Sequence, residues 1–119
     1  MQPPITIDDH GDLSIFERLE DAEKYVEPID VSRGDLVAYD SEGRLLRGRI
    51  VKTWLFGLGR GVKLELAEDA PQHVLALRQS LIEFLVELGE PGDVLETESL
   101  PELIAKGITR LRPRTKKKD

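Results

Sequence analysis

Three glycines at alternate positions form the first pattern in this sequence that could do chemistry, in the segment Gly57-Leu58-Gly59-Arg60-Gly61. A phosphate-binding loop needs a helix after its glycines, because the amides of the helix N-terminus meet the anion. Here the alternating residues 62–66 follow and predict a strand instead. We therefore interpret the glycines as a hairpin turn, with Arg60 at its tip able to contact an anion.

The two histidines are the next candidates for chemistry. His10 falls in a predicted turn and His73 in the first turn of a predicted helix, and the chain has no cysteine. Metal sites and nucleophile–base pairs need converging His, Cys or carboxylate groups, and His73 with Asp69 makes only a weak cluster. The sequence therefore predicts no catalytic residue, no metal site and no cofactor, and we expect that the protein is not an enzyme.

Acidic side chains are the most numerous chemical groups near the N-terminus. Nine acids stand against two bases in the first thirty residues, and nothing in their spacing selects an acid–base pair. They form either a solvated face or a recognition surface for a basic partner. The partner-binding candidates are Asp8, Asp9, Asp12, Glu20, Glu23 and, from a later helix, Arg78.

Arg78 lies in the middle of the apolar sector of a helix that the periodicity predicts over residues 71–88. Burying a guanidinium without a partner is costly. We expect Arg78 to pair with a carboxylate, either within the chain or across an interface. Leu81 and Leu85, near the centre of the same sector, should face the sheet.

A basic strand offers a different chemistry. Its cations lie along one strand beside two aromatics, in the order Arg44, Arg47, Arg49, Lys52, Trp54 and Phe56. Such interleaving is typical of single-stranded nucleic-acid platforms. Nearby acids could neutralise these cations.

The elements that must position these groups follow from periodicity and turn residues. Residues 5–16 predict a hairpin and residues 19–26 a short helix that stops at Pro28. Residues 36–67 predict a three-stranded antiparallel meander, which the first hairpin could extend.

Two further helices complete the prediction. Asp69 and Gly89 suit the caps of the helix over residues 71–88, whose apolar sector of about 200° is wide enough to be covered on two sides. Ser99 and Glu102 form a capping box for a last helix that Gly107 should close. The expected fold class is α+β, with an antiparallel sheet of three to five strands, one long helix and two shorter helices.

The charge is divided unequally along the chain. Residues 1–109 carry 11 Lys or Arg against 22 Asp or Glu, whereas residues 110–119 carry six bases and one acid. We expect a single globular domain over residues 1–111 and a disordered basic tail over residues 112–119. The lack of cysteine, signal peptide and long apolar run favours a cytoplasmic protein.

Residues 15–28 and 39–44, IFERLEDAEKYVEP and YDSEGR, resemble a group of small bacterial proteins to which no activity is attached. In size and acidity the chain is similar to immunity proteins of bacterial toxin systems. We expect a non-enzymatic acidic module that binds a basic protein, as a monomer or weak dimer. The alternative is a nucleic-acid-associated protein that uses the strand from Arg44 to Phe56 and the basic tail.

Overall fold

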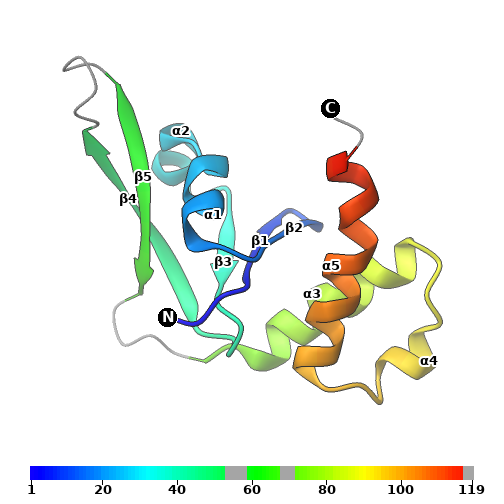
Figure 1. Cartoon of the computed structure of the whole chain (residues 1–119). Helices are drawn as coiled ribbons and strands as arrows, with labels where there is room; N and C mark the ends of the chain where they lie inside the picture. The colour runs from blue at the N-terminus through cyan, green and yellow to red at the C-terminus, as the bar shows by residue number, and fades with distance from the viewer. Residues whose placement is uncertain (53–58, 68–71, 117–119) are drawn as a thin grey trace.

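In a computed structural model, the described residues form five antiparallel strands and five helices (Figure 1). The structure describes residues 1–52, 59–67 and 72–116, with side chains as far as residue 111. The strands are β1 (Ile5–Asp9), β2 (Asp12–Phe16), β3 (Val37–Tyr39), β4 (Leu45–Lys52) and β5 (Arg60–Leu66). The helices are α1 (Leu19–Tyr25), α2 (Pro28–Arg33), α3 (Val74–Glu87), α4 (Gly92–Leu95) and α5 (Leu100–Lys116). The α+β class with an antiparallel sheet is confirmed.

The strands form one sheet in the order β2-β1-β3-β4-β5. The predicted meander is confirmed as β3, β4 and β5, and the predicted N-terminal hairpin joins it through pairing of β1 with β3. Thr6 lies opposite both Ile15 and Tyr39, so these three side chains share one face of the sheet. The neighbouring residues in each strand face the other side.

Each face of the sheet has its own apolar core. On one face, α1 and α2 cover strand residues such as Ile7 and Leu46. On the other face, α3, α4 and α5 pack with Leu13 and Tyr39. Figure 1 shows α3 and α5 beside the β1–β2 hairpin, whereas the β4–β5 hairpin extends away from them.

The turn between β3 and β4 attaches the sheet to α3. Gly43 has a φ of 79°, the left-handed conformation expected for this loop, and its carbonyl accepts a hydrogen bond of 2.7 Å from the backbone N–H of His73. A Cβ at Gly43 would lie 2.9 Å from Val74 Cγ2. Close approach and positive φ therefore both require glycine here.

The helix ends differ in part from the prediction. α3 begins at Val74, and Gly89 follows its end with a φ of 101°, as its predicted capping role requires. The proposed cap Asp69 lies outside the described residues. Pro28 starts the additional helix α2, because proline suits a first helical turn as well as it ends a preceding helix.

The prediction that Gly107 closes the last helix is wrong, since α5 continues to Lys116. Gly107 is buried, and a Cβ there would lie 2.5 Å from Ile15 Cδ1. It therefore allows α5 to approach β2, while Ile108 and Leu111 extend the apolar face beyond it. The backbone of residues 112–116 belongs to α5, and residues 117–119 of the predicted tail lie outside the described part.

Candidate interaction surface

The β1–β2 turn carries the first three candidate acids. Asp8 accepts hydrogen bonds from the backbone N–H of Gly11 at 2.7 Å and from Ser80 Oγ at 3.1 Å, so its carboxylate closes the turn and joins it to α3. Asp9 Oδ1 lies 4.0 Å from His10 Nε2 in the same turn, and Asp12 is exposed. Asp8 thus has a structural role within the fold.

Helix α1 carries Glu20 and Glu23. Glu20 is exposed, with its carboxylate 3.6 Å from Arg18 Nε. Glu23 is largely buried and accepts a hydrogen bond of 2.8 Å from the backbone N–H of Leu64, on the outer edge of β5. A carboxylate in this position occupies a donor that another strand could otherwise bind.

The groove between α1 and β5 has mixed charge. Its volume is about 530 Å³, and its charged lining consists of three acids and three bases. These are Glu20, Glu23, Glu27, Lys24, Arg60 and Lys63. The acids of α1 therefore border a groove whose acids and bases are equal in number. The partner-binding candidates of the sequence analysis are divided between the β1–β2 turn, α1 and α3, so they do not form one cluster.

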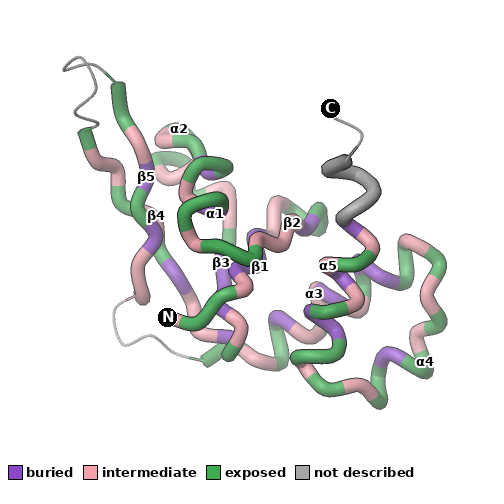
Figure 2. The backbone as a smooth tube through the Cα atoms, viewed as in Figure 1, coloured by how far each residue is buried: buried purple, intermediate pink, exposed green. Residues whose placement is uncertain are grey.

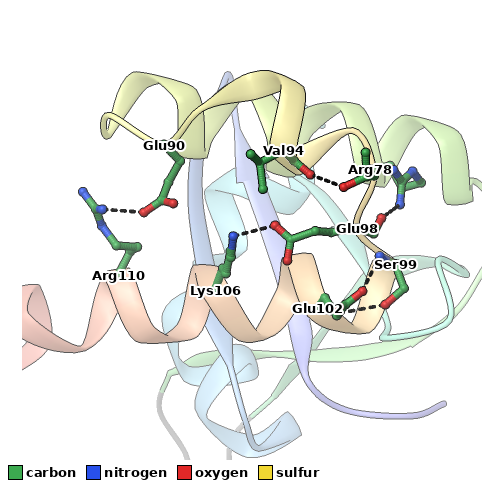
Figure 3. A network of polar contacts seen from close by, with 9 residues as sticks. Arg78, Glu90, Val94, Glu98, Ser99, Glu102, Lys106 and Arg110 are labelled. Atoms are coloured by element: carbon green, nitrogen blue, oxygen red, sulfur yellow. Dashed lines mark hydrogen bonds and ion pairs between the residues drawn. The ribbon is translucent and has the colours of Figure 1, made fainter.

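Arg78 finds its partners within the chain, which was one of the two predicted alternatives. These partners are backbone carbonyls and not carboxylates. Its guanidinium donates to the backbone carbonyl of Glu98 at 2.6 Å and to that of Glu96 at 3.3 Å. The prediction of a carboxylate partner is wrong, because carbonyls left free in the segment between α4 and α5 lie within reach (Figure 3).

Two cations of α5 hold the same connecting region (Figure 3). Arg110 donates to Glu90 Oε2 at 2.7 Å and to the carbonyl of Leu88. Lys106 donates to the Glu98 carboxylate, and this hydrogen bond raises the pKa of Lys106. Lys106 and Arg110, the bases of α5 whose side chains are described, thus hold the segment between α3 and α5 against α5.

The segment from α3 to the start of α5 is rich in acids and contains no lysine or arginine over a long stretch. Residues 79–105 contain seven acids and neither lysine nor arginine. Glu90 and Glu98 pair with α5, and Glu102 caps that helix with Ser99, which lowers the pKa of the Glu102 carboxyl. The four others are exposed and belong to none of the ion pairs in the described part of the chain: Glu83, Glu87, Asp93 and Glu96.

Exposed apolar side chains lie on the same two helices, α3 and α4. Val86 and Val94 are each 45% exposed, and Leu75 is 82% exposed. Val86 reaches toward Gly92, where a Cβ would lie 3.4 Å from Val86 Cγ2, so the end of α3 meets α4. We call these three residues and the four acids the α3–α4 surface. Figure 2 shows α4 and its flanking turns as largely exposed.

The end of α3 adds to the negative potential of this surface. Its last turn contains no basic residue and ends at Glu87. The carboxyl end of a helix carries a partial negative charge, which bases usually offset. At α3, Arg110 offsets part of this charge by donating to the carbonyl of Leu88, so the attraction of the α3–α4 surface for cations rests mainly on its four exposed acids.

The basic strand is partly neutralised by neighbouring acids. Arg47 Nη2 lies 3.2 Å and Arg49 Nε 2.7 Å from the carboxylate of Glu65, and these hydrogen bonds hold the pKa of Glu65 below its usual value. Arg44 pairs with Asp40 at 2.9 Å. Trp54 and Phe56 lie outside the described residues.

The strand register places further cations beside this strand, which the sequence interpretation missed. Arg49 lies opposite Lys63, and Lys52 lies opposite Arg60. Like charges directly opposite each other destabilise a strand pair. Arg60 and Lys63 are visible in the sequence of residues 60–66. Their position opposite Lys52 and Arg49 becomes clear only when the pairing of β4 with β5 is known.

The remaining candidates do not converge. His10 and His73 are both exposed, Gly61 belongs to β5, and Gly57 lies outside the described residues. Within the described ranges, no three His, Cys, Asp or Glu side chains gather in a group that could hold a metal ion. No helix in the described part is long and apolar enough to cross a membrane.

Comparisons of the chain with protein-family models, with curated proteins and with solved structures gave no match. The geometry of the chain itself therefore carries the functional argument.

Proposed function

We propose that the protein is a non-enzymatic binding module that attaches to a basic protein through its α3–α4 surface. One observation carries the proposal. Four exposed acids lie on this surface with exposed apolar residues, in a stretch of 27 residues without lysine or arginine. An acidic surface of this kind attracts a basic partner at long range and increases its association rate.

An inhibitory or immunity role suits this chemistry. A protein that handles nucleic acid carries a cationic site, and an acidic module that covers this site blocks it. The absence of cysteine fits a reducing compartment such as the cytoplasm.

Direct nucleic-acid binding is less well supported. The pairing of Arg47 and Arg49 with Glu65 reduces the positive charge of β4, and the acids of the α3–α4 surface repel phosphates.

The test uses the full chain, a fluorescent 20-residue polylysine and a fluorescent 20-nucleotide single-stranded DNA, with binding followed by anisotropy. We expect the polylysine to bind more tightly than the DNA and to weaken as salt is added. Glu83→Gln/Glu87→Gln should weaken polylysine binding several-fold.

The matched control is Glu20→Gln/Asp21→Asn, which removes the same charge from α1 and should have a smaller effect. Equal losses from both double variants would show that only net charge matters. Tighter binding of the DNA would favour the nucleic-acid alternative.

A further inference from the structure

Helix α3 also carries apolar side chains outside its buried side. Leu75, Gln79, Ile82 and Val86 fall within a sector of about 60° at 100° per residue, which we call the α3 stripe. Leu75 and Val86 are exposed, Ile82 is half-buried against the core, and the polar Gln79 donates a hydrogen bond to Glu83. Leu77, Leu81 and Leu85 occupy the buried side and have no exposed area. The wide apolar sector of this helix is therefore only partly explained by the cores of the domain.

Acidic groups border this stripe on both sides. Glu83 and Glu87 follow one side of α3, one turn apart. Arg78 lies on the other side of the stripe and binds the carbonyls of Glu96 and Glu98, which places that acidic segment next to it. Because its guanidinium donates to these carbonyls, Arg78 is directed into the fold.

The acids beside the stripe determine which kind of molecule could bind there. A second copy of the chain would bring the same acids face to face, and repulsion would oppose a symmetric dimer. A nucleic acid would bring phosphates against carboxylates. A basic amphipathic helix would place its apolar residues on the stripe and its cations beside the acids.

We propose that the α3 stripe binds an amphipathic helix of another protein, in which lysines or arginines flank a row of apolar residues. The proposal rests on the proposed function and specifies its partner. The stripe from Leu75 to Val86 is about 16 Å long, at 1.5 Å per residue. It matches about three turns of a partner helix with apolar residues at positions i, i+4, i+7 and i+11.

Two synthetic peptides of 18 residues test this geometry. Both contain the same leucines, lysines and alanines, and only one has its leucines in the i, i+4, i+7, i+11 order. The second peptide has the same composition in scrambled order, so net charge is constant. Anisotropy titrations measure the Kd of each peptide for the full chain.

The ordered peptide should bind at least about tenfold more tightly than the scrambled one, because only it can bury its leucines on the stripe. Leu75→Gln/Val86→Gln should remove this preference and leave binding of the scrambled peptide unchanged. Leu75→Gln alone should reduce it, and this residue is too exposed for the change to unfold the protein. The control Ile29→Gln/Val37→Gln removes two exposed apolar residues from the α2–β3 region and should leave the preference intact.

Equal affinities for the two peptides, both lowered by Glu83→Gln/Glu87→Gln, would overturn the helix-binding proposal and leave the acidic binding function in place. Failure of both peptides to bind would overturn the proposed function as well. A preference that survives Leu75→Gln/Val86→Gln would show that the helix binds elsewhere.

Discussion

At the scale of single residues, the most strongly engaged acid is Asp40, which was not among the candidate residues. Its buried carboxylate accepts hydrogen bonds from the backbone N–H groups of Gln2, Glu42 and Arg44 and from Arg44 Nε, at 2.9–3.1 Å. Burial alone would raise its pKa, but these hydrogen bonds outweigh burial and lower it. Asp40 therefore fastens the N-terminus to the β3–β4 turn.

Asp40→Asn should lower the free energy of unfolding at neutral pH by about 2–3 kcal/mol, the scale of hydrogen bonds to a charged group. Because the folded pKa lies below the usual 3.8, this stabilisation is present above pH 3.8 and is lost as the pH falls through the lower folded pKa. Urea unfolding of both proteins from pH 7 to pH 3 measures the difference, which should shrink at the acidic end. A difference that stays constant over this range would contradict the role of the ionised carboxylate. The exposed Asp21→Asn is the control and should change little at any pH.

Arg78→Met should cost about 1.5–3 kcal/mol of stability, because two backbone carbonyls lose a charged donor. The molecular mass measured by light scattering should stay the same, since both partners lie within the chain. Arg33→Met, at the exposed end of α2, serves as the control for removal of a positive charge. A change of association state would contradict the internal assignment of Arg78, and unchanged stability would mean that its two hydrogen bonds contribute nothing.

At the scale of elements, one side of α3 is buried in the core and the other carries the side chains that we propose bind a partner. Leu81 has no exposed area, whereas Leu75, on the stripe, is 82% exposed. Leu81→Ala should destabilise the protein by about 2–5 kcal/mol. Leu75→Ala, the same change on the same helix, should stay within about 0.5 kcal/mol. Thermal or urea unfolding compares the two variants, and a cost at Leu75 as large as that at Leu81 would contradict the exposure of Leu75.

The sequence predicted those elements whose signals are local. The capping box of Ser99 and Glu102 is formed, with hydrogen bonds of 2.8 and 3.3 Å, and the strand alternation from residue 62 gave the correct faces of β5. The continuation of α5 past Gly107 was missed, because that glycine is explained by the contact with Ile15, which is distant in sequence.

For the candidate surface, the sequence predicted the acidic character but not which residues form it. Acidity was visible in the composition, but the partners of Asp8, Glu23 and Arg78 depend on contacts across 72, 41 and 20 residues of chain, respectively. These contacts remove the three residues from the set available to a partner. The α3–α4 surface could have been found from the absence of lysine and arginine over residues 79–105.

At the scale of the whole molecule, charge is separated between two ends. The β4–β5 hairpin, residues 45–66, contains five bases and one acid, and the α3–α4 surface lies at the opposite side of the molecule (Figure 1). A basic partner is therefore attracted to the α3–α4 surface rather than to the β4–β5 hairpin. The balanced groove beside α1 contributes little to this attraction.

The most direct test of the α3–α4 surface is a titration of the ¹⁵N-labelled full chain with the ordered leucine–lysine peptide, followed by backbone amide shifts. A chain of 13.4 kDa gives resolved spectra for this purpose. The largest shifts should fall in residues 75–96, and Glu83→Gln/Glu87→Gln should reduce them while Glu20→Gln/Asp21→Asn leaves them. Shifts confined to residues 8–30 or to the β4–β5 hairpin, or no shifts at all, would contradict the account.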